Sequence, residues 1–363
     1  MATTKRHPLT KPQSAKDQAS PSAPPWPSYT GTAQFVGTSL NGRVTVYVDP
    51  TLGQPGLQNA QDLVNDADRV VAANDNDFFG TPGGPVSVII FAMDGATDGS
   101  EGADHNGCDY QTGAAIEVCA SFGSSARVSG LFEAELSECS MGGNLCGVST
   151  GEALSRWCAA VVSDNALPDF ATAKTWAQNG MPDWVNRTDP TDRNPISTGC
   201  GMAFLSWLMS QGFDLGKIAP AMVSLGDSGT LAQLYASLTG NPASQAWGKF
   251  RTAVLQLPGG VTNDDPFGGG PHLTPLASMN PALVGLAGKV FSAILADLAQ
   301  GKPDHQIVAN VRAVLSAAGK ALGGGCCPKT SHRLRASQVS EPSPDYPSGS
   351  HHGSNPEPGS AEE

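Results

Sequence analysis

The sequence has no run of about 18 apolar residues, so it predicts no membrane-spanning helix. It also lacks an excess of positive charge, because 33 Asp and Glu residues outnumber 21 Lys and Arg, for a net charge of −12 over 363 residues. Binding to nucleic acid or to anionic lipid requires a basic face. We therefore expect neither a nucleic-acid partner nor attachment to a membrane by charge.

Several short motifs that carry chemistry are also absent from the chain. There is no Gly-x-x-x-x-Gly-Lys-Ser/Thr loop and no Gly-x-Gly-x-x-Gly turn between a predicted strand and helix, so nucleotide binding has no support. No Cys-x-x-Cys pair is present, which removes the usual signature of a structural zinc site. The chemistry has to be sought in less standard arrangements.

The 43 glycines and 28 prolines are concentrated in segments that predict the domain boundaries. Residues 1–30 and 323–363 are polar and rich in Pro, Ser and Gly, so we expect two disordered tails. Residues 31–257 form the main domain, and residues 258–280 read as a Gly/Pro-rich linker. Residues 281–322 predict a helical hairpin, which could pack on the main domain or act as a docking or oligomerisation element.

Hydrophobic periodicity predicts an α+β fold, with a small N-terminal mixed sheet and helices followed by a mostly helical half. β-Branched or apolar segments predict strands at residues 43–48, 85–91 and 115–121. Helical spacing predicts helices near residues 57–73, 127–141, 151–163, 169–180, 199–211, 230–239, 244–255, 281–300 and 304–321.

The first 30 residues lack the apolar core of a secretory signal peptide, so we expect a cytoplasmic protein, with export by another route left open. Eight cysteines are present, and their disulfide state is open at this point. Cys108 could pair with Cys119, and Cys139 with Cys146, or the cysteines could be buried thiols.

A cluster of carboxylates on one predicted helix is the most informative feature. Glu135 and Glu138 share a helix face with an apolar stripe, whereas Glu133 is expected to point to water. Carboxylates on an apolar face are costly unless they are paired, protonated or bound to a cation. Arg127 or Arg156 could neutralise them, or the face could line a wet groove.

The segment AELSE at Ala134–Glu138, followed by GEALSR at Gly151–Arg156, resembles the paired helices of thermolysin-like zinc metallopeptidases, the gluzincins. The resemblance implies a zincin-like fold in which Glu135 is the general base and Glu138 and Glu152 hold zinc. It also implies that an edge strand, residues 115–121, would hold a peptide substrate. Ala134 stands where the family has its first zinc-binding histidine, and Glu138 stands at the second.

Other interpretations of the acidic residues remain open. Glu152 could belong to a capping box that starts at Ser149. His105 could reach the carboxylates only through the fold. The loop Asp94–Asp109 holds five acidic residues among glycines, so it could bind calcium, although its spacing does not match an EF-hand.

These observations favour a zincin-like protein that is a non-catalytic or strongly diverged metallopeptidase homologue, and a peptide or another protein could be its partner. One alternative is a metal-dependent hydrolase, with zinc as cofactor and Glu135 as base. Another is an unrelated binding or structural module. The sequence leaves the substrate and the oligomeric state open.

Overall fold

The computed structural model describes residues 21–106, 114–270 and 306 of the chain. The strands and helices named here lie in the first of two compact units, residues 1–288. The strands are β1 (Gln34–Thr38), β2 (Val44–Val48), β3 (Val86–Phe91), β4 (Ala103–His105) and β5 (Ala114–Cys119). The helices are α1 (Gly53–Ala72), α2 (Ser125–Met141), α3 (Ser149–Ser163), α4 (Ala173–Gln178), α5 (Pro195–Ser210), α6 (Leu215–Leu225), α7 (Leu231–Thr239) and α8 (Ala246–Leu255).

The five strands form one mixed sheet in the order β1-β2-β3-β5-β4, which confirms the α+β prediction. β2, β3 and β5 run parallel, while β1 and β4 pair antiparallel with their neighbours. The expected edge strand at residues 115–121 is wrong, because β5 pairs on both sides and β4 is the outer strand of the described sheet. β4 has only three residues, too few to show a periodic pattern.

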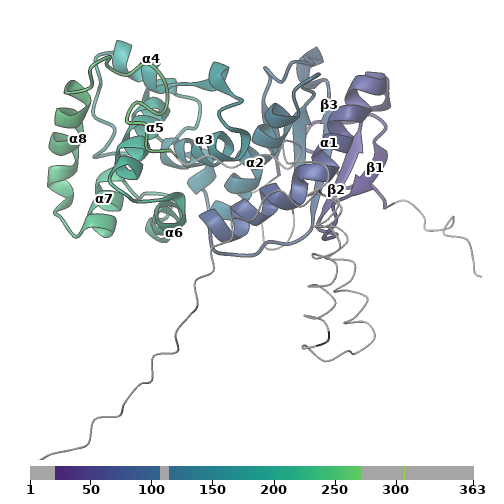
Figure 1. Cartoon of the computed structure of the whole chain (residues 1–363), viewed down its shortest axis with the longest axis horizontal. Helices are drawn as coiled ribbons and strands as arrows, with labels where there is room; N and C mark the ends of the chain where they lie inside the picture. Colours follow the sequence, from purple (N-terminus) through teal and green to yellow (C-terminus); the bar gives the residue numbers. More distant parts are fainter. Residues whose placement is uncertain (1–20, 107–113, 271–305, 307–363) are drawn as a thin grey trace, which may run out of the picture. The chain divides into compact units, whose positions relative to one another are not determined.

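One face of the sheet forms the main core of the domain. Alternating residues of β2, β3 and β5, among them Val46, Val88 and Val118, point to this face and are fully buried. α1 and α2 cover it, and the apolar stripe of α1, including Leu63 and Val70, lies against the strands. Figure 1 shows α1 beside the strands, with α2 and α3 between the sheet and the later helices.

The opposite face of the sheet is covered by the polypeptide that precedes β1. Trp26 packs edge-on against Tyr47, with ring centroids 5.6 Å apart, and Tyr29 lies 5.0 Å from Phe91. The fully buried Glu117 of β5 accepts hydrogen bonds from the backbone N–H groups of residues 28 and 29 and from the residue 28 hydroxyl, at 2.6–2.9 Å. Residues 21–30 therefore pack on the sheet, which corrects the expectation that the N-terminal tail extends to residue 30.

Replacement of Glu117 by Ala should detach this N-terminal segment, because two backbone N–H groups and the Ser28 hydroxyl would lose a charged acceptor. We expect a loss of about 3 kcal/mol in the free energy of unfolding and faster proteolysis near Trp26. Urea unfolding and limited proteolysis measure the two effects. Glu101→Ala, at an exposed loop carboxylate, is the control. Equal behaviour of both variants would contradict this role.

The sequence of α2 shows one apolar stripe, but the helix is buried on most of its surface. The side of α2 that carries Glu133 therefore does not face solvent. That side chain is completely buried, which corrects the expectation that it points to water. Neither of its carboxylate oxygens has a hydrogen-bond partner among the described residues. Burial raises the pKa of Glu133 well above its ordinary value, Asp75 adds to the rise, and Arg69 opposes it.

The raised pKa of Glu133 makes a prediction about stability and pH. The native state holds the proton more tightly than the unfolded chain, so this residue should lower stability as the pH rises above 4.5, where the unfolded carboxyl ionises. Glu133→Gln should remove that fall and be more stable than the wild type at neutral pH by about 1 kcal/mol or more. Urea unfolding across a pH series tests this, with Glu101→Gln as control. Parallel pH profiles for Glu133→Gln and the wild type would contradict the assignment.

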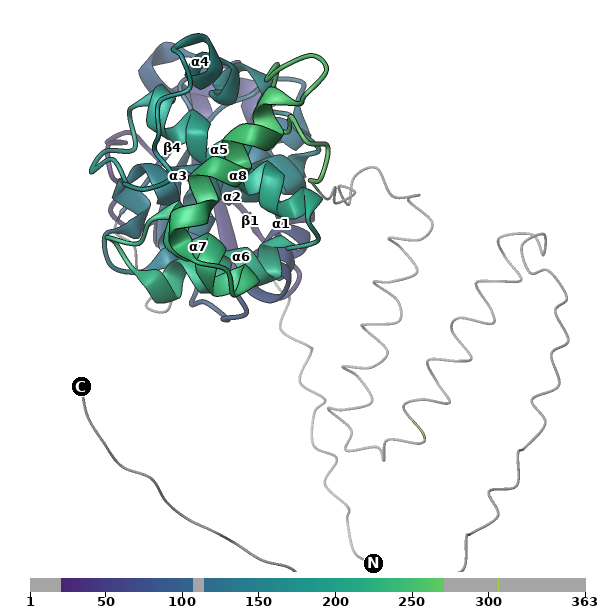
Figure 2. The same ribbon diagram turned by 90° about the vertical axis from the view of Figure 1, so that its left-hand side faces the viewer.

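The helical half is organised around α5, which is buried along most of its length and contacts α3, α4, α7 and α8. Figure 2 views this half end-on, with α8 in front of α5 and with α6 and α7 beside them. Hydrophobic periodicity did not predict α6, which contains Pro220 in its interior and follows Gly212. No helix among the described residues is long and apolar enough to cross a membrane.

Residues 258–270 belong to the helical half, which corrects their interpretation as linker. Asp264 accepts hydrogen bonds from the backbone N–H groups of Thr172 and Ala173 at the start of α4, at 2.9 and 2.6 Å. Asp265 accepts one from the Ser206 hydroxyl of α5 at 2.6 Å. The rest of the linker, the helices expected at 281–300 and 304–321, and the C-terminal tail lie outside the described residues, except residue 306, which is helical.

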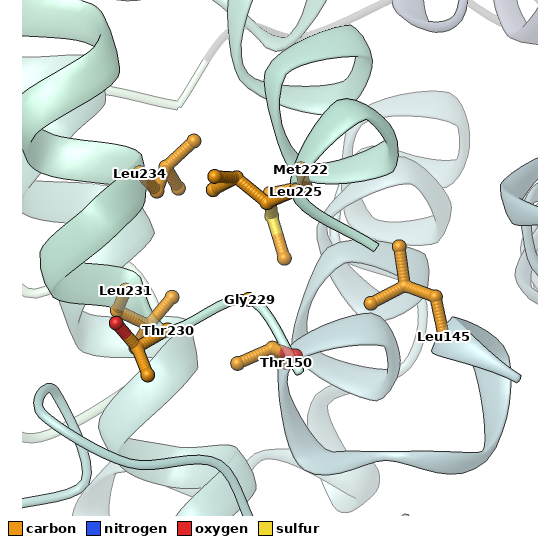
Figure 3. Close-up of a pocket in the computed structure, with 8 residues that line it drawn as sticks. All are labelled: Leu145, Thr150, Met222, Leu225, Gly229, Thr230, Leu231 and Leu234. Carbon is orange, nitrogen blue, oxygen red and sulfur yellow. The ribbon is translucent and has the colours of Figure 1, made fainter. Parts of the chain in front are cut away.

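A small cavity lies where α3, α6 and α7 meet (Figure 3). Its volume is about 10 Å³, and its lining is mostly Leu and Met side chains, including Leu145, Met222 and Leu234. This volume holds one water at most, and the lining offers that water few polar partners. The cavity is therefore a packing defect and not a ligand site.

Candidate metal centre

Three elements bring chemically reactive side chains to one place. α2 carries Glu135 and Glu138, α3 carries Glu152, and β4 carries His105. α2 packs against both α3 and β4. The pairing of β4 with β5 sets His105 opposite Ile116, at the end of the outer strand. The imidazole that sequence alone could not place thus reaches the carboxylates of α2.

The distances show direct contact between the imidazole and both glutamates of α2. His105 Nδ1 lies 2.7 Å from Glu135 Oε2 and 3.7 Å from Glu138 Oε2. The Ser155 hydroxyl of α3 donates a hydrogen bond to Glu138 Oε1 at 3.1 Å. The side chains of His105, Glu135 and Glu138 are only 10–14% exposed. The cluster is therefore well shielded from water.

Glu152 joins the cluster from α3 but has a partner of its own. Its Oε1 accepts a hydrogen bond from Arg156 Nε at 2.5 Å, and the Arg156 guanidinium also donates to the backbone oxygen of Phe170. The capping-box interpretation is wrong, because Val148 is the N-cap residue of α3 and has no side-chain cap. The Ser149 hydroxyl instead accepts a hydrogen bond from the backbone N–H of Asp189.

The sequence left open whether Arg127 or Arg156 neutralises Glu135 and Glu138. In the structure each of these arginines pairs with a different carboxylate. Arg127 forms an ion pair with Asp169 at 2.6 Å and donates to the Gly99 carbonyl. Arg156 pairs with Glu152. Three carboxylates thus face one guanidinium and one imidazole, and the cluster has an excess of negative charge when its carboxylates are ionised.

Burial raises the pKa of two carboxyl groups in this cluster, those of Glu135 and Glu138. Desolvation raises the pKa of Glu135, and the hydrogen bond with His105 opposes that rise. Desolvation raises the pKa of Glu138 well above its ordinary value, and the neighbouring charges of Glu135 and Glu152 add to the effect. Carboxylates held so close together retain protons unless a cation replaces them.

One group of three donor residues in the described part of the chain could hold a metal ion. It comprises His105, Glu138 and Cys146, whose ligand atoms all lie within 4.8 Å of one another. Nitrogen, oxygen and sulfur donors together suit zinc and similar transition metals better than calcium. Of this group, Glu138 was expected from the sequence to bind metal and His105 was left open, whereas Cys146 was expected to be either a disulfide partner or a buried thiol.

Cys146 is disulfide-bonded in this structure. Cys119, Cys139, Cys158 and Cys200 are buried thiols, so neither of the two pairings considered from the sequence is present. The partner of Cys146 is not among the described residues. As a disulfide, the Cys146 sulfur is not available as a thiolate ligand.

The described carboxylates of the acidic loop Asp94–Asp109 do not gather into a group that could bind calcium. Asp98 accepts a hydrogen bond from the backbone N–H of Ser100 at 3.0 Å, and Asp104 accepts one from the N–H of His105 at 2.8 Å. Within the described part of this loop, residues 94–106, the carboxylates do not form a three-donor group of the kind seen at Glu138. Asp109 lies outside the described residues, so calcium binding by the whole loop stays a prediction.

No family model, curated protein or solved structure matches this chain significantly. The candidate centre therefore has to be interpreted from its own geometry and donor chemistry.

Proposed function

We propose that this protein is a metal-dependent hydrolase with a diverged, zincin-like centre that acts on peptides. The observation that carries the proposal is the arrival of His105, from the outer strand β4, at the two glutamates of α2. Two carboxylates alone are a weak zinc site, whereas an imidazole beside them supplies the donor type that zinc prefers.

The charge balance supports a cation at this position. Glu135, Glu138 and Glu152 would carry three negative charges in a largely buried volume, against the single permanent positive charge of Arg156. Burial raises the pKa of both Glu135 and Glu138, and the nearby carboxylates add to the rise, so the ionised cluster is costly without a cation. A divalent ion held by His105 and Glu138 would compensate the charge directly.

The hydrogen bond between His105 and Glu135 orients the imidazole for this role. With a proton on Nδ1, His105 donates to Glu135 and keeps the lone pair of Nε2 for a metal ion. A bound ion of this class lowers the pKa of water and polarises a carbonyl. Glu135 lies three residues before Glu138 on α2, and in this proposal it is assigned as the general base.

The outer strand suggests how a peptide would be held. β4 is the last strand on its side of the described sheet, and it ends at His105. An extended peptide could pair with the open edge of such a strand and be positioned by backbone hydrogen bonds. This geometry would place a backbone carbonyl of the peptide near the cluster.

A second candidate is a scaffold that keeps this fold without catalysis. Ala134 has no donor atom at the position of the first ligand in the metallopeptidase motif, and Glu152 is paired with Arg156. Under this alternative the cluster is a structural group of acids. The two functions differ in whether metal binding and hydrolysis are measurable and depend on the same residues.

His105→Ala and Glu138→Gln should each lower zinc affinity by at least about 100-fold, because each removes a ligand. They should also abolish metal-dependent peptide hydrolysis. Isothermal titration with zinc and a screen with a fluorogenic peptide library measure the two effects.

Glu133→Gln is the matched control, since it alters a buried glutamate of the same helix that lies outside the cluster. It should retain zinc affinity and hydrolysis. Zinc binding that is equally strong in His105→Ala, Glu138→Gln and Glu133→Gln would place the metal elsewhere and contradict the proposal.

Glu135→Gln separates a general base from a residue that only orients His105. As the base, Glu135 should be needed for turnover when the site is saturated, so kcat should fall by about 10²–10⁴-fold with zinc bound. An orienting role would instead reduce zinc affinity by about 10–100-fold, and excess zinc would restore kcat. Zinc titration and kinetics at saturating zinc decide between the roles, and full rescue by zinc would contradict the assignment as base.

A further inference from the structure

We propose that Cys146 is the third ligand of this metal centre and that it becomes available when its disulfide is reduced. The inference rests on the proposed metal centre and adds its redox control. Cys146 Sγ lies within 4.8 Å of the ligand atoms of both His105 and Glu138. The same sulfur is in a disulfide in this structure, so ligation and disulfide bonding compete for one atom.

The backbone holds Cys146 at the metal centre independently of its disulfide. Cys146 lies in the short 3-10 turn Leu145–Gly147, which joins α2 to α3, the two helices that carry the carboxylates. The turn is closed by a hydrogen bond from the Gly147 N–H to the Asn144 carbonyl at 3.0 Å. Asn144 is in turn held by Asp227, which accepts from its backbone N–H and its side-chain amide.

The first turn of α3 packs closely against the turn Leu145–Gly147. A Cβ atom at Gly151 would lie 1.9 Å from the Leu145 carbonyl oxygen and 3.2 Å from the Cys146 Cα. Glycine is therefore required for this close approach. With the turn fixed on both sides, reduction should change the chemistry of the sulfur without moving it away from His105 and Glu138.

The two redox states offer different donor sets. A disulfide sulfur is neutral and a poor ligand, which leaves His105 and Glu138 as the donors of the oxidised protein. A thiolate is a strong ligand for zinc and cobalt. The reduced protein then presents three protein ligands from three elements, the number typical of catalytic zinc sites.

The reaction balances with a dithiol as reductant. One thiolate of the dithiol attacks one sulfur of the protein disulfide and releases the other protein sulfur as a thiolate. The second thiol of the dithiol then attacks the mixed disulfide and releases the protein sulfur held in it. Two electrons and two protons pass to the protein, which gains two thiols, while the dithiol becomes a cyclic disulfide. The Cys146 thiol loses its proton to solvent when the cation binds.

Cobalt(II) is the probe of choice, because a thiolate ligand gives cobalt a charge-transfer band in the near ultraviolet. Full-length protein is prepared oxidised, and a second sample is reduced with a phosphine, which transfers two electrons and takes up oxygen from water. Both samples are desalted without oxygen before titration. The band should appear in the reduced wild type alone, and cobalt should bind that state at least about tenfold more tightly.

Cys146→Ser should show no band in either state and should bind cobalt with the affinity of the oxidised wild type. Cys119→Ser is the control, because a serine can keep the contact that the Cys119 thiol makes with the Ala96 carbonyl. It should behave as the wild type. A thermal melt of each variant checks that the fold is retained.

The outcomes separate this inference from the metal centre on which it rests. Equal cobalt affinity in the two redox states, or a band that survives in Cys146→Ser, overturns the role of Cys146. If His105→Ala and Glu138→Gln also leave cobalt affinity unchanged in both states, the metal centre itself is wrong. If those two variants weaken binding while reduction has no effect, only the redox inference fails.

Discussion

The burial of three carboxylates beside one imidazole is the constraint on which the centre depends. Glu135, Glu138 and Glu152 come from two packed helices, and His105 comes from a strand. Bringing like charges together in a shielded volume costs free energy unless protons, a guanidinium or a metal ion compensate. Arg156 compensates one of them, and the remaining imbalance is the physical reason to expect a cation.

The rest of the fold keeps these groups at their distances. The sheet positions β4 beside α2, and its second face is sealed by the N-terminal segment, which bonds to Glu117 of the neighbouring strand β5. The helical half holds α3 through α5 and also fixes the turn before α3 through Asp227. Elements far apart in sequence therefore pack together and fix the positions of the side chains in the acidic cluster.

Sequence periodicity placed Glu135 and Glu138 on one helix face, and the resemblance of the segments AELSE and GEALSR to the paired helices of gluzincins drew attention to Glu152. His105 was beyond such reasoning, because β4 is too short to show a pattern and its position depends on pairing with β5. Glu133 was wrongly expected to face water. α2 is enclosed on nearly all sides, so a polar residue in its sequence does not indicate an exposed helix face. Cys146 carries no local signal, since its sulfur comes near His105 and Glu138 only through the folded arrangement of β4, α2 and the turn before α3.

The central claim, that the cluster holds a metal ion, is tested most directly by elemental mass spectrometry. The full chain would be purified without a histidine tag, kept reduced, loaded with zinc and dialysed against metal-free buffer. The account predicts about one equivalent of zinc per chain, removed by chelator together with part of the thermal stability. Protein that retains no zinc, and whose melting temperature is the same with and without chelator, would contradict it and leave the cluster as a group of protonated structural acids.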